Sequence, residues 1–332
     1  MIADIVVDLQ YGDCGKGKVT HHLLRTSKYT HCIRYNGGCN AGHTIFHEGK
    51  KFVTHHIPAG VFFGVRSIIG SGCVVNLEQF FSEIDELEAA GIDCKNLIKI
   101  AKNTHIITNE HVEEDQKEFS IGTTKRGNGP AYRDKYARKG IRAEELEVLE
   151  PYVVDLYTEL HSPYPTCVLL EGAQGFGLDI DWGDYPYVTS SHCTAAGALL
   201  NGIPPFSVRK IYGVAKAYET YVGAKNFEPK EEIFQKLRDA GDEYGATTGR
   251  PRQCNWTNID LLEKAAKING ITDLVINKVD VMREVNSWCF RFGDSITTRF
   301  QGENEWKNFL KSYMKKKMGN VKIYFSESPE EI

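Results

Sequence analysis

A glycine-rich segment near the start of the chain places the strongest constraint on the fold. The run Gly12-Asp13-Cys14-Gly15-Lys16-Gly17-Lys18 directly follows an apolar stretch, Ile5–Leu9, and precedes a segment with helical character. Glycines let backbone N–H groups surround phosphate oxygens, and a helix amino terminus and lysine side chains add positive potential. The run matches GxxxxGK, but Val19 stands where such loops carry the Ser or Thr that binds magnesium. We therefore predict a strand–loop–helix phosphate site in which Asp13 supplies the oxygen ligand for a metal.

Short apolar runs followed by glycine-rich turns recur along the chain. They occur at Ile5–Leu9, Ser67–Ile69, Val168–Leu170, Ile211–Val214 and Leu274–Ile276, with helix-like segments between many of them. Bounded, β-rich runs are typical of buried strands. Their alternation with helices predicts an α/β fold with a large, mainly parallel (mixed) sheet flanked by helices. Ligands of such a sheet bind at the carboxyl ends of the strands, where the glycine-rich turns lie.

Two further helices and a last strand are expected from periodicity. Apolar residues between Leu77 and Leu97 mark one helical stretch, with Gly91 as a stop signal. Trp306 to Met314 mark another, before a strand at Val321–Phe325. With 332 residues, the chain exceeds the usual size of a single core. This length fits either two lobes or one large α/β domain with insertions, and we expect the second, over residues 1–332.

A second motif, Asn277-Lys278-Val279-Asp280, follows the apolar run that ends at Ile276. An aspartate at this place can accept hydrogen bonds from guanine N1–H and from the 2-amino group. Adenine has an acceptor at N1 and nothing at C2, so it would leave Asp280 as an unpaired buried charge. Four residues alone are a weak signal, but together with the phosphate loop they predict GTP.

Four other loops carry polar side chains suited to ligand binding. The loop 36–44 contains His43, a donor suited to a phosphoryl group in transfer. Hydroxyls and cations at 122–130 suit a second phosphate, and Gln174, within 171–175, suits a base edge or a capping role. The loop 245–252 carries Arg250 and Arg252, whose planar forks bind carboxylates bidentately, which favours a dicarboxylate substrate. The alternative interpretation is that Arg250 and Arg252 are exposed on the surface and bind no ligand.

Composition excludes several classes of protein. A formal net charge of −4 gives no basic face for nucleic acid. No apolar run approaches the roughly 18 residues that a membrane helix needs. The opening residues lack a basic region and reach Asp8 too soon for a signal peptide. Nine scattered cysteines without a CxxC pair indicate free thiols and no zinc site. We expect a cytoplasmic protein, or one of the host cytoplasm if the source is viral.

In this order, the motifs resemble the adenylosuccinate synthetase family over nearly the whole chain. The matching runs are QYGDCGKGK, NGGCNAGHT, IPAGV, GTTKRGNGPAYRDKYARKGIR, LLEGAQGFGLDIDWGDYPYVTSS, EYGATTGRPRQ and NKVD. The resemblance implies a fold related to P-loop GTPases, with a large sheet and flanking helices. It also implies a magnesium-dependent ligase of purine biosynthesis that converts IMP, L-aspartate and GTP to adenylosuccinate, GDP and phosphate.

The resemblance assigns the chemistry to two loops. It implies that Asp13 removes the purine N1 proton and binds magnesium, so that O6 attacks the γ-phosphate. His43 matches the acid that stabilises the transferring phosphoryl group, and Lys16 matches a phosphate contact. The carbonyl of Gly42 matches a second magnesium ligand. The 6-phosphoryl intermediate then loses phosphate to the aspartate amine.

The remaining implied roles divide the binding residues among three substrates. Those matching GTP contacts are Gly12, Cys14, Gly15, Lys16, Gly17, Lys18, Gly42, Thr44, Lys278, Asp280 and Ser326. Those matching contacts to the purine monophosphate are Asp13, Asn40, Thr124, Arg138, Gln174, Thr189 and Arg250. Those matching the aspartate loop are Thr247, Thr248, Arg250 and Arg252. Arg138 matches an arginine that crosses from a neighbouring subunit, which implies a homodimer.

Two other interpretations stay open. Within the family, phage relatives convert GMP or dGMP to a 2-amino-succinyl product, and the opening VVDLQYG resembles them more than the GTQWGDE of cellular members. Retention of Asp13, where those relatives often have a small residue, favours IMP. Outside the family, a signalling GTPase would explain GxxxxGK and NKVD, but not GAQG, GATTGRPR or NAGHT. The chain is also shortened between Arg142 and Val168, as in compact archaeal and phage members, and Tyr221 stands where an arginine is usual.

Overall fold

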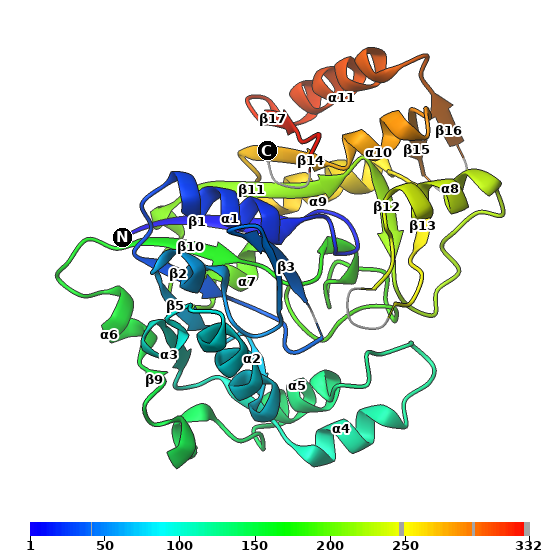
Figure 1. Cartoon of the computed structure of the whole chain (residues 1–332). Coiled ribbons are helices and arrows are strands. Elements are labelled where there is room, and N and C mark those ends of the chain that lie inside the picture. The colour runs from blue at the N-terminus through cyan, green and yellow to red at the C-terminus, as the bar shows by residue number, and fades with distance from the viewer. Residues whose placement is uncertain (41, 246–248, 294–295, 329–332) are drawn as a thin grey trace.

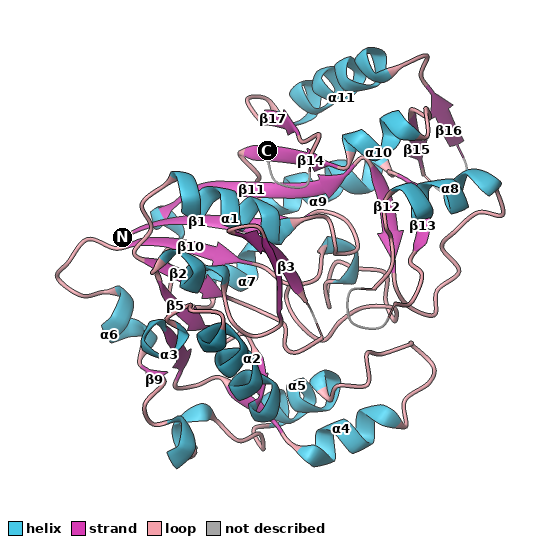
Figure 2. Cartoon of the chain, in the orientation of Figure 1, coloured by secondary structure: helices cyan, strands magenta, loops and turns pink. Residues whose placement is uncertain are grey.

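A large parallel sheet lies at the centre of the molecule (Figures 1 and 2). The computed structural model describes residues 1–40, 42–245, 249–293 and 296–328. The strands of the central sheet are β1 (Ile2–Asp8), β2 (His31–Arg34), β5 (Arg66–Ile69), β7 (Ile98–Ala101), β9 (Val153–Val154), β10 (Cys167–Glu171), β11 (Val208–Lys216), β14 (Asp273–Asn277) and β17 (Lys322–Phe325). Over the described residues their order is β17-β14-β11-β1-β10-β2-β5-β7-β9. All eight neighbouring pairs are parallel.

Smaller strand pairs surround this sheet. They are formed by β3 (His43–His47) with β4 (Lys50–Thr54), β6 (Val74–Asn76) with β8 (His105–Ile107), β12 (Tyr218–Tyr221) with β13 (Gln253–Trp256), and β15 (Cys289–Phe292) with β16 (Ile296–Arg299). The pair β6–β8 is parallel and the other pairs are antiparallel hairpins or ribbons. The predicted α/β fold with a large, mainly parallel sheet flanked by helices is therefore confirmed. That it forms a single domain stays a prediction.

Helices cover both faces of the sheet and extend past its ends (Figure 2). They are α1 (Lys16–Thr26), α2 (Leu77–Ala89), α3 (Cys94–Leu97), α4 (Asn109–Gln116), α5 (Asn128–Ala137), α6 (Leu156–Leu160), α7 (Ala195–Leu199), α8 (Glu232–Ala240), α9 (Ile259–Asn269), α10 (Val279–Glu284) and α11 (Glu303–Met318). The helix expected from Leu77 ends at Ala89, because Gly91 takes a φ of +87°, and Leu97 belongs to the separate α3. Among the described helices, none has both the length and the apolar character to cross a membrane.

The core is divided by the sheet into two layers. Successive side chains of a strand point to opposite faces, so Ile5 and Val7 of β1 pack into one cluster while Val6 packs into the other. The first cluster includes apolar residues of α7, α9 and α11, and the second those of α1 and α2. Apolar contact on both faces explains why β1, β10 and β14 read as unbroken hydrophobic runs. All nine cysteines are free thiols, as expected.

Buried polar residues gather where the central strands end. Asp8 ends β1, Arg34 ends β2, Glu171 ends β10, Lys216 ends β11 and Asn277 ends β14, and each is at most 3% exposed. Parallel strands bring these five ends to one edge of the sheet. Buried charges need partners, so this edge has to contain a connected network of polar contacts. It is also the edge at which open α/β sheets bind ligands.

Candidate functional site

The loop between β1 and α1 is organised around the carboxylate of Asp8. Its Oδ1 accepts hydrogen bonds from the backbone N–H of Gln10 (3.0 Å) and Gly12 (3.2 Å), and its Oδ2 accepts one from Cys14 (3.1 Å). The first intrahelical bond of α1 runs from Val19 N to Gly15 O. The earlier N–H groups therefore point out of the amino end of α1, which is the arrangement that binds phosphate.

The two lysines of the loop point in different directions. Lys16 is 5% exposed, and its Nζ lies 3.0 Å from Asp8 Oδ2 and 2.5 Å from the carbonyl oxygen of Gln174. The Nζ of Lys18 instead donates to Ser326 Oγ and, at 2.9 Å, to the Ser328 carbonyl. Burial lowers the pKa of Lys18 to about 8. The loop is thus joined to the segment after β10 through Lys16 and to the carboxyl-terminal segment through Lys18.

The motif at 277–280 holds the other side of the same loop. Asn277 Nδ2 donates to the Cys14 carbonyl at 2.6 Å. A Cβ on Gly15, where φ is +93°, would lie 2.7 Å from that Nδ2, so this close approach requires glycine. Lys278 donates through Nζ to the Gly241 carbonyl at 2.8 Å. The charge of Asp280, in the first turn of α10, raises the pKa of both Lys18 and Lys278, although burial outweighs it in each case. The structure therefore brings the two predicted GTP motifs together.

An amide network lies beside the loop. Gln174, at a φ of +57°, donates from Nε2 to Asn40 Oδ1 at 3.0 Å. Its Oε1 accepts from Asn36 Nδ2 (3.2 Å) and from Ser191 Oγ (3.4 Å). The predicted purine contacts Asn40 and Gln174 are thus neighbours, and Asn36 and Ser191 hold the Gln174 amide in one orientation. A fixed amide can distinguish donors from acceptors on a base edge.

His43 is buried against two charged residues. Its Nε2 lies 2.6 Å from Arg34 Nη1, and its Nδ1 lies 3.6 Å from Glu171 Oε1, which also lies 3.1 Å from Arg34 Nε. Burial, followed by the charge of Arg34, lowers the pKa of His43 to about 4. Because a guanidinium only donates, Nε2 accepts and the ring proton lies on Nδ1. In this arrangement the neutral ring contacts Arg34 and Glu171, so donation to a phosphoryl group requires the ring to leave this contact.

The predicted base and one predicted aspartate-loop arginine form an ion pair. Asp13, at a φ of +57°, is 47% exposed at its side chain, and its Oδ2 lies 3.0 Å from Arg252 Nε. Arg250 is exposed. Thr247 and Thr248 lie outside the described residues. The sequence predicted that Arg252 binds a carboxylate, and in this structure it contacts two from the protein itself, those of Asp13 and Glu243.

The other predicted residues lie around this centre. Thr44, in β3, packs against α1, since a Cβ on Gly17 would lie 3.0 Å from the Thr44 carbonyl oxygen. Thr124 is exposed on the loop before α5, and Thr189 donates its backbone N–H to Leu178 at 2.8 Å. Arg138 is exposed at the end of α5. It lines a cavity of about 760 Å³ that Asn36 and Ser191 also line, so this cavity connects the amide network with Arg138.

One carboxylate at the phosphate loop fits the magnesium that the resemblance implies. The exposed carboxylate of Asp13 offers the hard oxygen ligand that this ion prefers. Among the described residues, Asp179, Asp181 and His192 also lie close enough together to hold a metal ion. However, Asp179 Oδ1 already accepts the N–H of Asp181 and of Trp182, and Oδ2 accepts that of Cys193 at 2.6 Å. We therefore interpret this second group as a loop-forming cluster.

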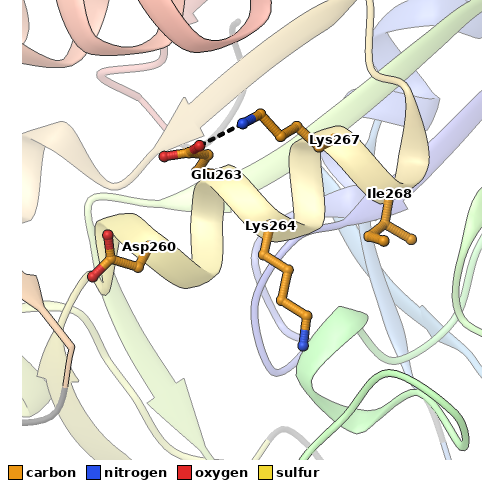
Figure 3. A pocket seen from close by; sticks show the side chains of 5 residues that line it. All are labelled: Asp260, Glu263, Lys264, Lys267 and Ile268. Carbon is orange, nitrogen blue, oxygen red and sulfur yellow. Dashed lines mark hydrogen bonds and ion pairs between the residues drawn. The ribbon is translucent and has the colours of Figure 1, made fainter.

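A shallow pocket on α9 has no part in this centre (Figure 3). It is lined by Asp260, Glu263, Lys264, Lys267 and Ile268, all from the same helix. Glu263 and Lys267 pair at 2.6 Å along the helix, as the dashed line shows. None of the predicted site residues lines it, and alternating charges one helical turn apart are typical of a solvated helix surface.

Sequence reasoning missed the buried partners of the predicted residues. Asp8, Arg34, Lys216 and Glu243 were not singled out, and Glu171 was noted only as the first residue of a glycine-rich loop. The available signal was position, since four of them end a strand at the carboxyl edge of the sheet. A charged residue that closes an apolar run has to be paired inside the protein, so it is a better candidate than its neighbours.

Comparison with known proteins gives a consistent result. A sequence model of the adenylosuccinate synthetase family matches residues 5–150 and 144–291. The adenylosuccinate synthetase of Halothermothrix orenii is 39% identical, over 90% of this chain and 83% of that protein. That of Thermodesulfovibrio yellowstonii is 36% identical over the same shares of each chain.

Solved structures agree with these sequence relatives. The fully ligated adenylosuccinate synthetase of Plasmodium falciparum superposes with a TM-score of 0.86 at 27% identity, covering 98% of this chain and 97% of that one. The succinoaminodeoxyadenylate synthetase of cyanophage S-2L, bound to dGMP and dATP, gives a TM-score of 0.76 at 20% identity, covering 99% and 93%. The second likeness shows a shared fold only.

Proposed function

Since this chain belongs to the adenylosuccinate synthetase family, whose members are carbon–nitrogen ligases, we propose that it joins L-aspartate to the 6-position of IMP with GTP as phosphoryl donor. In the first step the purine N1 proton passes to Asp13, O6 bonds to the γ-phosphorus, and GDP leaves. In the second step the aspartate amine bonds to C6, and the 6-phosphoryl group leaves as phosphate. The product is adenylosuccinate.

The observation that carries this proposal is the position of Asp13. Its carboxylate is within the phosphate loop, it is half-exposed, and its partner Arg252 is suited to a substrate carboxylate. A general base has to lie within hydrogen-bond reach of the proton that it removes. A carboxylate at this position fits a purine that has an N1–H beside O6. IMP has this edge, and the sequence relatives, which are named adenylosuccinate synthetases, favour IMP over the guanine nucleotides that share the edge.

We assign GTP to the surface between the phosphate loop, residues 12–18, and the motif at residues 277–280. The phosphates are proposed to bind Gly12, Cys14, Gly15, Lys16, Gly17 and Lys18, with Gly42 and Thr44 on the adjoining segment. Guanine is proposed to bind Lys278, Asp280 and Ser326. The link from Asn277 to Cys14 supports this assignment, because it fixes the distance between the base reader and the phosphate loop. Magnesium, when bound by Asp13 and the Gly42 carbonyl, neutralises charge on the transferring phosphoryl group.

The acceptor nucleotide is assigned to the amide network and its cavity. The proposed contacts are Asn40, Thr124, Gln174, Thr189 and Arg250, with Arg138 from a second subunit of a homodimer. L-Aspartate is assigned to Thr247, Thr248, Arg250 and Arg252. His43 is proposed to donate to the phosphoryl group once its ring leaves Arg34, which stays paired with Glu171.

The test is a matrix of IMP, GMP and dGMP against GTP and ATP, with L-aspartate and magnesium, read by product mass and by phosphate release. We expect adenylosuccinate from IMP with GTP, and no phosphate release when L-aspartate is omitted. Asp13→Asn should reduce turnover by at least about 1,000-fold while GTP binding, measured by calorimetry, stays within about threefold. If a 2-amino-succinyl product forms from GMP or dGMP, the acceptor nucleotide is a guanine nucleotide and not IMP, within the same family.

A further inference from the structure

A buried charge cluster behind the aspartate loop has no role in the chemistry above. Glu243 is 0% exposed and Lys216, at the end of β11, is 1% exposed. Lys216 Nζ lies 2.8 Å from both carboxylate oxygens of Glu243 and donates to Thr220 Oγ1 at 2.8 Å. The hydroxyl of Tyr218 donates to Glu243 Oε1 at 2.6 Å. Dehydrating two charges is costly, and an apolar pair of similar size often gives equal stability. Stability alone therefore does not account for this charged pair.

The cluster continues from Glu243 to Arg252. Arg252 Nη1 lies 2.6 Å from Glu243 Oε2, and the backbone N–H of Arg252 donates to the Glu243 carbonyl at 2.9 Å. The two residues therefore face each other across the base of the aspartate loop, joined at both backbone and side chain. Lys216 and Tyr218 donate to the Glu243 carboxylate and hold it in place. This carboxylate in turn holds the Arg252 guanidinium from its buried side.

One guanidinium is thus shared by two unlike carboxylates. On the buried side, Glu243 accepts a short hydrogen bond from Nη1. On the exposed side, Asp13 Oδ2 lies 3.0 Å from Nε, but the N–H is not aligned for a hydrogen bond. Burial alone raises the pKa of Glu243, but Lys216 and Arg252 outweigh it and lower that pKa to about 2. Glu243 therefore stays ionised at neutral pH, and its hold on Arg252 persists whatever happens at Asp13.

We infer that Glu243 is a positioning residue that fixes Arg252 between Asp13 and the incoming carboxylate of the amino-acid substrate. The substrate carboxylate exchanges with Asp13 for the outer edge of the guanidinium, while Glu243 keeps the inner edge. Arrival of the amino acid then releases the base from its ion pair. Proton removal is thereby coupled to occupancy of the amino-acid site. This inference rests on the proposed function, because it needs a carboxylate substrate.

Two variants separate positioning from stability. Glu243→Gln keeps the shape of the side chain but removes its charge, and it leaves Lys216 as an unpaired buried cation. The double variant Lys216→Met, Glu243→Gln removes both charges, so that its stability recovers while Arg252 still lacks its inner carboxylate. Glu263→Gln, which removes the charge that pairs with Lys267 and Lys317 on a helix outside the proposed site, is the control.

We expect both cluster variants to raise the KM for L-aspartate about tenfold or more, with the KM values for GTP and the purine nucleotide within about twofold of wild type. The control should match wild type in all three KM values.

A double variant with a wild-type KM for L-aspartate would overturn the inference, since the cluster would then serve stability alone. Equal increases in all three KM values would overturn it as well. These results differ from failure of the proposed function itself. In that case the wild-type protein would release phosphate at the same rate with and without L-aspartate, and both the function and this inference would be lost.

Discussion

The carboxylates of this site are alike in chemistry and differ in burial. Asp8 and Glu171 are buried, and each is surrounded by donors. Burial alone raises the pKa of Glu171, but Arg34 and His43 outweigh it and the pKa is lowered. Asp13 is half-exposed and has one misaligned partner. Asp8 and Glu171 therefore have a structural role, whereas Asp13 is able to leave Arg252 and contact a substrate.

Asp280 gives a test of nucleotide choice at the level of one atom. In Asp280→Asn, an amide NH₂ donor replaces one carboxylate oxygen acceptor. The 2-amino group of guanine then loses its acceptor, whereas the C2 carbonyl of xanthine gains a hydrogen-bond donor. We expect the kcat/KM ratio for GTP over xanthosine triphosphate to fall by at least about 100-fold. Steady-state kinetics with both nucleotides measure it. Glu284→Gln, exposed on the same helix, should leave the ratio unchanged; if both variants behave alike, Asp280 does not read the base.

At the level of elements, the sequence predicted strands and loops that have a local pattern, and it missed contacts between residues far apart in the chain. Apolar runs located β1, β5, β10, β11 and β14, because strands buried on both faces have no polar side to interrupt them. The strand β2 was missed because its sequence, HCIR, has only two apolar residues between a histidine and an arginine, which is too short a run to indicate a strand. The loops of the site were found from glycines that the backbone requires. Contacts such as Arg34 with Glu171 join residues far apart in the chain, so no local pattern contains them.

The loop between β1 and α1 depends on one carboxylate, and we expect Asp8→Asn to disorder it. The amide places a donor where Cys14 N–H and Lys16 Nζ now donate, so about 2–3 kcal/mol of stability should be lost. The KM for GTP should rise about tenfold. Denaturant unfolding and steady-state kinetics measure these effects.

Asp4→Asn is the matched control for this loop, since Asp4 is also buried in β1 but pairs with Tyr29 and Arg209 away from the loop. It should lose stability with an unchanged KM for GTP. Two variants with the same KM for GTP would show that Asp8 supports the strand and has no influence on the phosphate site.

At the scale of the whole molecule, the exposed position of Arg138 requires an explanation. The residue lies at the end of α5 with a φ of +60°, and Tyr136 beside it is 64% exposed. Both line the cavity that leads to Asn36 and Ser191. Arginine and aromatic residues, such as these two lining residues, are enriched at the centres of protein interfaces. This surface is consistent with the proposed homodimer, in which each Arg138 enters the cavity of the other subunit.

Mixed dimers test that arrangement directly. Arg138→Ala and Asp13→Asn should each be inactive alone, because every site lacks one group. In a mixture that has exchanged subunits, half of the dimers are mixed, and each has one site with an intact Asp13 from one chain and an intact Arg138 from the other. About a quarter of wild-type activity should therefore return. If Arg138 acts within its own subunit, a mixed dimer contains no complete site, and activity stays at the level of the separate variants after any incubation.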